Sequence, residues 1–239
     1  MNVLELTLPT PAENLACDEA LLDAAEAGEA GEVLRFWEPQ QHFVVVGYAN
    51  KVATEVNVPA CESRGVPILR RCSGGGTVLQ GPVCLNYTLV LNIQADELLH
   101  SIAAANHCIM ERNRTALEWL LQRPVAIEGH TDLTVDGFKF SGNSQRRRRR
   151  FLLFHGTFLL NFDIALIEAL LPAPSKQPDY RQDRTHTDFL TNLRQPAPAI
   201  QAALVHAWKA TAPRPDLPET RIETLVRRKY ATRVWSFKF

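Results

Sequence analysis

The chain has 239 residues, of which 46% are hydrophobic and 22% charged, a composition typical of a globular protein with a full apolar core. Its 26 Lys and Arg residues balance its 26 Asp and Glu residues, which excludes the strong overall charge that recruits nucleic acid or an anionic membrane. Five cysteines stand at irregular spacing without a CxxC pair, so neither a zinc site nor a disulfide framework is indicated, and reduced thiols fit best.

The N-terminal residues carry no basic segment and no long apolar core, so no signal peptide is predicted. No apolar run approaches the ~20 residues that a membrane helix needs, and the prediction is a soluble, cytoplasmic protein without membrane contact. Alternating apolar and polar residues predict a strand over residues 3–8. A helix over residues 11–27 follows, with Thr10 as N-cap, Glu13 completing a capping box and Gly28 ending it.

The middle of the chain combines short strands with one long helix. Strands are expected over residues 33–37, 43–46, 66–71, 77–79 and 84–93, with a short helix over residues 57–64. Apolar residues at helical spacing predict a long helix over residues 96–122. Further strands are expected over residues 125–127, 131–135, 138–141 and 151–160. The pair Asp136-Gly137 between two of these strands is a strong hairpin signal.

Helices dominate the last part of the chain, over residues 163–171 with Asp163 as cap, and over about 197–210 and 218–230. Many strands are joined by turns too tight for a parallel crossover, so the sheet is predicted to be mixed and mostly antiparallel, and the class α+β. Residues 1–239 are expected to form a single domain, with residues 179–239 as a candidate small helical part.

Two arginines stand directly before three consecutive glycines in the run Arg70-Arg71-Cys72-Ser73-Gly74-Gly75-Gly76. Glycines allow positive φ and remove the Cβ atoms that would keep a ligand away from main-chain N–H groups. Guanidinium groups provide forked donors for phosphate or carboxylate. The segment therefore predicts a loop that holds an anionic ligand against bare backbone. The alternative is a glycine-rich hairpin turn flanked by surface arginines.

A lysine, Lys139, alternates with two phenylalanines on a predicted strand and is followed by the small polar run Ser141-Gly142-Asn143-Ser144. The simplest interpretation is a solvated surface lysine. The small residues leave open space beside the ammonium group, however, and a positioned point charge can neutralise a carboxylate or an α-phosphate as charge shifts during a reaction.

Three further polar features are candidates. His155-Gly156-Thr157 stands in an otherwise apolar strand, where the glycine suggests close approach of another group, although a lone histidine is more often structural. Asp132 is a lone carboxylate near a strand start and serves equally well as a turn residue. Five arginines at positions 146–150 predict either a solvated loop or a patch for an acidic protein partner or ligand phosphates. Without interleaved aromatic residues they do not indicate nucleic-acid binding.

Four segments together resemble the signatures of lipoate–protein ligases, in family order across roughly residues 10–165. They are Asn14-Leu15-Ala16-Cys17-Asp18-Glu19, the arginine–glycine run over residues 70–78, the lysine segment over 137–144, and residues 155–161. Each segment alone is a weak signal, whereas the combination is specific. The resemblance implies the catalytic-domain fold of the biotin and lipoate protein ligases, a mixed sheet with helices packed around it.

The resemblance also implies a two-step reaction. ATP and lipoate or octanoate give an acyl-adenylate and pyrophosphate, and the ε-amine of a lysine on an acceptor lipoyl domain then attacks the adenylate. Lys139 is expected to be catalytic, between the acyl carbonyl and the α-phosphate, and Mg²⁺ is expected with ATP, without a dedicated metal site. The residues expected to bind ATP and the acyl-adenylate are Arg70, Arg71, Ser73, Gly74, Gly75, Gly76, Thr77, Val78, Leu79, Asp132, Ser141, Gly142, His155, Gly156 and Thr157.

The chain departs from the family pattern in three respects. The family's Gly-Arg-Asn-Asp run is present as Gly129-His130-Thr131-Asp132, without its arginine, and Gln80-Gly81 stands where the signature often continues into His-Asp. The chain is also expected to lack the accessory C-terminal domain found in many of these ligases. Either a separate accessory subunit supplies that part, or the chain does not perform the whole ATP-dependent reaction.

Two alternative functions stay open. One is an octanoyl or lipoyl transferase that forms a thioester on Cys84 or Cys72. Related transferases place the nucleophile near the position of Pro124, where this chain has no cysteine, and this favours the ligase. The other is a non-catalytic homologue that holds a lipoyl domain. Biotin is an alternative ligand by fold, although the arginine–glycine signature favours lipoate.

Overall fold

The structure is a computed structural model that describes residues 1–212 and 216–239. Its largest element is a seven-stranded sheet in which each neighbouring pair is antiparallel except the parallel pair β1–β2. In order across the sheet, the strands are β1 (Asn2–Glu5), β2 (Val33–Trp37), β6 (Cys84–Asn92), β10 (Phe151–Leu159), β9 (Phe138–Arg147), β8 (Asp132–Val135) and β7 (Ala126–Glu128).

A second, three-stranded sheet consists of β4 (Ile68–Arg70), β3 (Phe43–Val46) and β5 (Val78–Gln80), with β3 parallel to β4 and antiparallel to β5. The predicted α+β class with mixed, mostly antiparallel sheets is confirmed.

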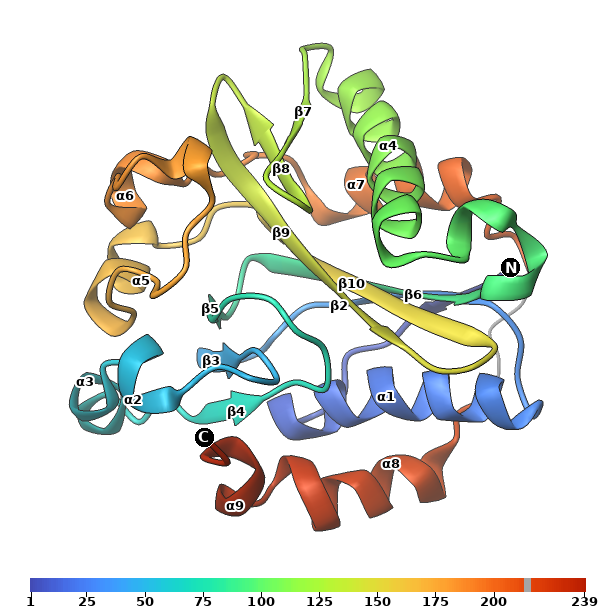
Figure 1. The fold of residues 1–239 in the computed structure, drawn as a ribbon, viewed down its shortest axis with the longest axis horizontal. Helices are drawn as coiled ribbons and strands as arrows, with labels where there is room; N and C mark the ends of the chain where they lie inside the picture. Colours follow the sequence, from blue (N-terminus) through green and yellow to red (C-terminus); the bar gives the residue numbers. More distant parts are fainter. Residues whose placement is uncertain (213–215) are drawn as a thin grey trace.

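Helices cover both faces of the large sheet (Figure 1). α1 (Pro11–Ala27) lies along one face, and α4 (Ile102–Leu121) with α7 (Ala197–Trp208) covers the other. The predicted capping box at the start of α1 is confirmed, because the side chains and backbone N–H groups of Thr10 and Glu13 bond reciprocally. Because both faces are covered, alternate residues of β6 and β10 enter two separate cores.

The C-terminal helices pack on opposite sides of the body. α7 packs against α4, whereas α8 (Glu219–Leu225) packs against α1. A π-helical turn, Val226–Tyr230, then leads into α9 (Arg233–Ser236), which packs against β4. The remaining helices are α2 (Val52–Glu55), α3 (Val58–Ser63), α5 (Ile164–Leu170), α6 (His186–Phe189) and the 3₁₀ turns Ile93–Ala95, Glu97–Leu99 and Asp179–Arg181. Within the described ranges, no helix is both long and apolar enough to cross a bilayer.

The long helix begins later than predicted. Its first residue is Ile102, because the side chain of Ser101 caps it by accepting a hydrogen bond from the N–H of Ala104. The preceding residues form separate 3₁₀ turns, one of which is capped by Asp96. The caps at Asp96 and Ser101 therefore divide what the apolar periodicity alone predicts as one helix.

The hairpin of β9 and β10 is longer than predicted. The Asp136-Gly137 turn before it is confirmed, with φ of 50° and 78°, the positive values that a type I′ turn requires. β9 extends to Arg147 instead of ending at residue 141, because its register with β10 continues to the pair Arg147–Leu152. The arginine run therefore begins inside a strand.

Candidate active site

Two rows of residues cross four neighbouring strands on the face of the large sheet that α1 and the small sheet cover. Residues directly opposite one another in an antiparallel pair point to the same face, so the register defines each row. From β9 through β10 and β6 to β2, the first row is Gly142, Thr157, Asn86 and Trp37, and the second is Ser144, His155, Thr88 and Arg35. We call these eight residues the polar floor.

Lys139 reaches over the β9 edge of the polar floor. A Cβ atom at Gly142 would lie 3.1 Å from both Cε and Nζ of Lys139, so glycine leaves the space that the lysine end occupies. The ammonium group forms an ion pair with Asp132, with 2.8 Å between Nζ and Oδ1. The Lys139 side chain is 23% exposed. A positive charge thus stands at the open edge of the floor, held by one carboxylate.

A segment far along the chain covers this ion pair. The hydroxyl of Tyr180 donates to Oδ2 of Asp132 at 2.8 Å, and the ring centroid of Phe189 lies 6.0 Å from Nζ of Lys139. Burial, followed by the charge of Asp132, raises the pKa of Tyr180 well above its ordinary value. The tyrosine hydroxyl therefore stays protonated and keeps donating to the carboxylate.

We define the glycine loop as residues 73–77. The side chain of Arg71 lies inside this loop and supports it. Its guanidinium donates to the carbonyl of Gly76 at 2.8 Å, to the carbonyl of Gly74 and to the hydroxyl of Ser73. Burial lowers the pKa of Arg71 to about 10, which still leaves it charged at neutral pH. Arg71 thus fixes the shape of the loop, and its expected grip on phosphate stays a prediction.

Gly75 is the position where the loop requires glycine. Its φ is 81°, and a Cβ atom there would lie 3.0 Å from Nη2 of Arg71. The loop is also tied to β9, since the hydroxyl of Ser144 donates to the carbonyl of Gly74 at 2.8 Å. The glycine loop is thereby fixed above the polar floor.

Arg70 is fully buried and faces away from the loop. All three of its guanidinium nitrogens donate to main-chain carbonyls, those of Gly47, Tyr48, Asn50, Trp235 and Ser236. The structure therefore gives Arg70 a supporting role between the segment over residues 47–50 and α9, with no donor directed at the polar floor. The two adjacent arginines, which the sequence treats as one pair, perform different tasks.

A chain of polar contacts links α1 to the glycine loop through His155. Nε2 of His155 lies 2.5 Å from Oγ of Ser73, and Nδ1 lies 3.3 Å from Oδ2 of Asp18. Arg35 pairs with Asp18 at 2.5 Å. Burial alone would raise the pKa of Asp18, but the charge of Arg35 and the hydrogen bond with His155 outweigh it and hold the pKa below its ordinary value. The ionised Asp18 fixes the histidine tautomer in which Nε2 accepts from Ser73.

Sequence reasoning did not single out Asp18 or Arg35 as site residues. The available signals were the N-terminal segment that resembles the family and a charged residue inside the apolar strand Val33–Trp37.

Other expected site residues lie in different surroundings. Thr77 receives a long hydrogen bond from Asn50 at the rim of the glycine loop, and Leu79 is buried in the core beside α5. Ser141 and Gly156 belong to the opposite face of the sheet, because they are opposite Phe158 and Tyr87, which pack in the core under α4. The period of two along a strand therefore separates Ser141 and Gly156 from Gly142 and His155.

The two thiols considered as nucleophiles are enclosed. Cys72 is 4% exposed and Cys84 is 0% exposed. Burial raises the pKa of each thiol to about 12, and for Cys72 the charge of Glu19 adds to the effect. Because the thiolate is the nucleophilic form, neither cysteine is activated in this structure.

Three members of the arginine run bond to other parts of the chain, whereas Arg149 is exposed. Arg148 pairs with Asp23 at 2.8 Å, Arg150 bonds with Glu26, and Arg147 donates to the carbonyl of Leu99. Carboxylates of α1 thus neutralise part of the run and hold the hairpin of β9 and β10 against that helix. The sequence could not show this arrangement because the partners are distant in the chain.

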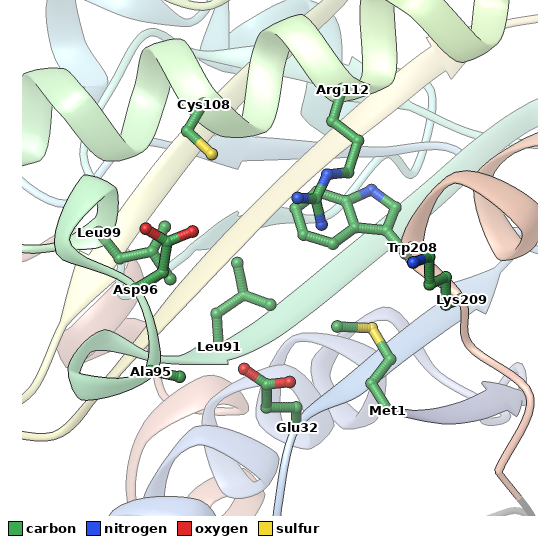
Figure 2. A pocket seen from close by; sticks show the side chains of 10 residues that line it. All are labelled: Met1, Glu32, Leu91, Ala95, Asp96, Leu99, Cys108, Arg112, Trp208 and Lys209. Carbon is green, nitrogen blue, oxygen red and sulfur yellow. The ribbon is translucent and has the colours of Figure 1, made fainter.

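A cavity of about 170 Å³ lies on the other face of the large sheet (Figure 2). Cys108 and Arg112 extend into it from α4, and the guanidinium of Arg112 stacks 4.4 Å from the ring centroid of Trp208. Glu32 and Asp96 also line it. The cavity is separated from the polar floor by the sheet itself.

The model of the lipoyl protein ligase A/B catalytic domain matches residues 10–207 of this chain. The chain belongs to this family. The resemblance to lipoate–protein ligases is thereby confirmed, and the protein is an enzyme of the lipoate ligase and octanoyltransferase family.

Individual relatives carry both kinds of name. The chain is 29% identical over 256 residues to an octanoyltransferase LipM of Carboxydothermus hydrogenoformans, covering 95% of each. It is 32% identical over 173 residues to a putative lipoate-protein ligase A of Aeropyrum pernix, covering 71% of this chain and 61% of that protein. Its fold is similar to a crystal structure of lipoate-protein ligase A bound with ATP, with a TM-score of 0.82 and 22% identity over 99% of this chain and 98% of the other.

Proposed function

We propose that this enzyme is an ATP-dependent lipoate–protein ligase of the cytoplasm. In the first step a carboxylate oxygen of lipoate or octanoate attacks the α-phosphorus of ATP, and pyrophosphate leaves. In the second step the ε-amine of a lipoyl-domain lysine attacks the acyl carbonyl, AMP leaves, and the nitrogen loses a proton. Both steps bring anionic groups together, so each needs a fixed positive charge and fixed donors.

The residues at the β9 edge of the polar floor suit these needs. Lys139 supplies the positive charge between the carboxylate and the α-phosphate, oriented by Asp132 at 2.8 Å. The glycine loop supplies main-chain N–H groups of three residues that have no side chain of their own, at a site whose shape Arg71 fixes. In this proposal Gly76, Thr77, Val78 and Leu79 bind the nucleotide through their backbone.

The observation that carries the proposal is the contrast between Lys139 and the candidate thiols. The ammonium of Lys139 is accessible at the floor, whereas Cys72 and Cys84 are enclosed and have raised pKa values. The group that a substrate can reach is a fixed positive charge and not a thiolate. This favours adenylation over thioester formation.

The described residues contain no group of three or more His, Cys, Asp or Glu side chains that could hold a metal ion. Asp132 is already bonded to Lys139 and Tyr180. Mg²⁺ therefore enters this proposal only as part of the magnesium–ATP substrate.

A lipoyl domain is the proposed acceptor. One structural neighbour, from Thermoplasma acidophilum, is described as a bi-partite lipoate protein ligase with its E2 lipoyl domain. We extend this to the present chain as a proposal, in which a separate accessory subunit is required for the complete reaction.

Octanoyl transfer through Cys84 or Cys72 is the second candidate. It is favoured by the name of the Carboxydothermus relative, which matches the chain nearly end to end. The transfer would require either buried thiol to become accessible and ionised.

Exchange of labelled pyrophosphate into ATP, dependent on lipoate or octanoate, distinguishes the two functions. The ligase predicts exchange that Cys84→Ser and Cys72→Ser retain and Lys139→Ala reduces by ~10²–10³-fold. Absence of exchange with every acid, together with octanoyl transfer between carrier proteins that Cys84→Ser or Cys72→Ser abolishes, would establish the transferase instead. Each assay includes an arm with an added accessory subunit.

A further inference from the structure

Five buried polar atoms on and above the polar floor have no hydrogen-bond partner among the described residues. One is Nε of Arg35, whose two terminal nitrogens are both bonded. The other four are Nε1 of Trp37, Oε1 of Gln80, Nδ2 of Asn86 and Oγ1 of Thr88. Each of these residues is more than nine-tenths buried. Leaving a buried donor or acceptor unpaired destabilises a protein, so such groups normally have a partner. Four of them gather in one place, where a bound water or a polar ligand group could pair with them.

The four atoms form one group at the β6 and β2 end of the floor. Asn86 stands directly opposite Trp37 in one row, and Thr88 follows two residues later on the same face. Gln80 joins them from β5 above, because its Nε2 donates to Oγ1 of Thr157 at 2.9 Å. Thr157 in turn donates to Oδ1 of Asn86.

The hydrogen bonds of this group determine which atoms stay unpaired. Gln80 uses its amide nitrogen and Asn86 uses its amide oxygen, both toward Thr157. The unpaired atoms are therefore one acceptor, on Gln80, two N–H donors, on Asn86 and Trp37, and one hydroxyl, on Thr88. A purely hydrocarbon group placed here would leave all four unpaired.

The group lies at a definite distance from Lys139. The first row runs from Gly142, beneath the lysine ammonium, across three strand spacings to Trp37, which is about 14 Å. An acid whose carboxylate is held by Lys139 would extend its chain along this row, under the glycine loop and β5. Its far end would then meet the unpaired atoms.

We propose that the far end of the polar floor recognises a hydrogen-bonding group at the end of the substrate acid, such as a hydroxyl or an amide. The enzyme would thus prefer a medium-chain acid functionalised at its far end over bare octanoate. This inference rests on the proposed function only in placing the carboxylate at Lys139.

Binding of octanoate and ω-hydroxyoctanoate, measured by calorimetry without ATP, tests the inference. The wild type is expected to bind the hydroxy acid about tenfold more tightly than octanoate. This is the gain in affinity that one or two additional hydrogen bonds provide. Thr88→Val preserves the shape of the side chain and removes its hydroxyl, and Trp37→Phe removes Nε1 while keeping an aromatic ring next to Phe43. Both variants are expected to reduce the preference to about threefold or less.

The matched control is Thr115→Val, on the exposed side of α4, which should keep the tenfold preference. Thermal melting should show that Thr88→Val does not destabilise the ligand-free protein, since its hydroxyl has no partner there. Equal affinity for the two acids, no binding of either, or a preference that both floor variants retain would overturn the inference, and the unpaired atoms would then bind only water. Pyrophosphate exchange is a separate readout, so failure of the ligase proposal is recognised independently.

Discussion

Oγ of Ser73 lies 2.5 Å from Nε2 of His155, a contact that joins the glycine loop to the floor of the large sheet. The histidine is itself fixed by Asp18 of α1, so three separate elements meet at one imidazole ring. The site is therefore pre-arranged by buried polar contacts, which can be tested one at a time.

Asp18→Asn removes the charge that Arg35 requires and should lower the free energy of unfolding by about 3 kcal/mol, because a buried guanidinium loses its counter-ion. Urea denaturation measures this value. The exposed pair of Arg221 and Glu29 provides the control. Glu29→Gln should change the free energy of unfolding by less than about 1 kcal/mol. An Asp18→Asn protein as stable as the wild type would contradict the assignment.

The same carboxylate predicts a pH dependence of stability. The pKa of Asp18 is lowered in the folded state, so the stability it contributes is fully present above its ordinary value of 3.8. This contribution is lost as the pH falls through the lower folded-state pKa. The difference in unfolding free energy between the wild type and Asp18→Asn should be constant from neutral pH down to about 4 and should narrow below it. A difference that shrinks already near pH 6 would point to another group.

Gly75→Ala should damage the site, whereas Gly74→Ala should not. At Gly75 a Cβ atom meets a positive φ and Nη2 of Arg71, while at Gly74 no atom lies within 4 Å of the added Cβ. We expect the alanine at position 75 to reduce the rate of pyrophosphate exchange by about tenfold or more, because the loop must shift. Similar rates for the two variants would show that the loop conformation does not matter for the reaction.

Lys139→Ala should reduce kcat of acid activation by ~10²–10³-fold, the usual loss for one preorganised charge-stabilising donor. The KM for ATP should change much less, since the lysine acts on charge that develops during the reaction. Lys209→Ala, at the end of α7, is the matched control. Retention of activity in Lys139→Ala would show that Lys139 is not the catalytic charge.

Tyr180→Phe removes the hydroxyl that holds Asp132 and leaves the aromatic packing on Phe189 in place. We expect kcat to fall about 3- to 10-fold with little change in KM, because Asp132 and through it Lys139 lose orientation. A change in KM alone, with kcat intact, would assign Tyr180 to substrate binding instead of lysine positioning.

Local signals in the sequence predicted several features that the structure contains. The capping box of Thr10 and Glu13 and the turn at Asp136-Gly137 each depend on residues within a few positions, and both are confirmed. The sequence also marked Lys139 and the glycine run as candidates, because they stand in segments that together resemble the family signatures.

The polar floor could not be predicted in this way. It depends on the register among β2, β6, β9 and β10, which places Trp37 opposite Asn86 although 49 positions separate them in the numbering. The pairing of Arg35 with Asp18 likewise spans 17 positions and joins a strand to a helix. Such contacts follow from tertiary packing, and no periodicity along the chain reports them.

The hydrogen bonds of Arg70 link a residue in the first third of the chain to residues that are synthesised much later. Its guanidinium bonds to the carbonyls of Trp235 and Ser236, some 165 positions later in the chain. A nascent polypeptide that has not yet emerged as far as these residues would have to bury a cation with part of its donors unsatisfied. The support that Arg70 gives behind the glycine loop can therefore be completed only after translation has passed this point.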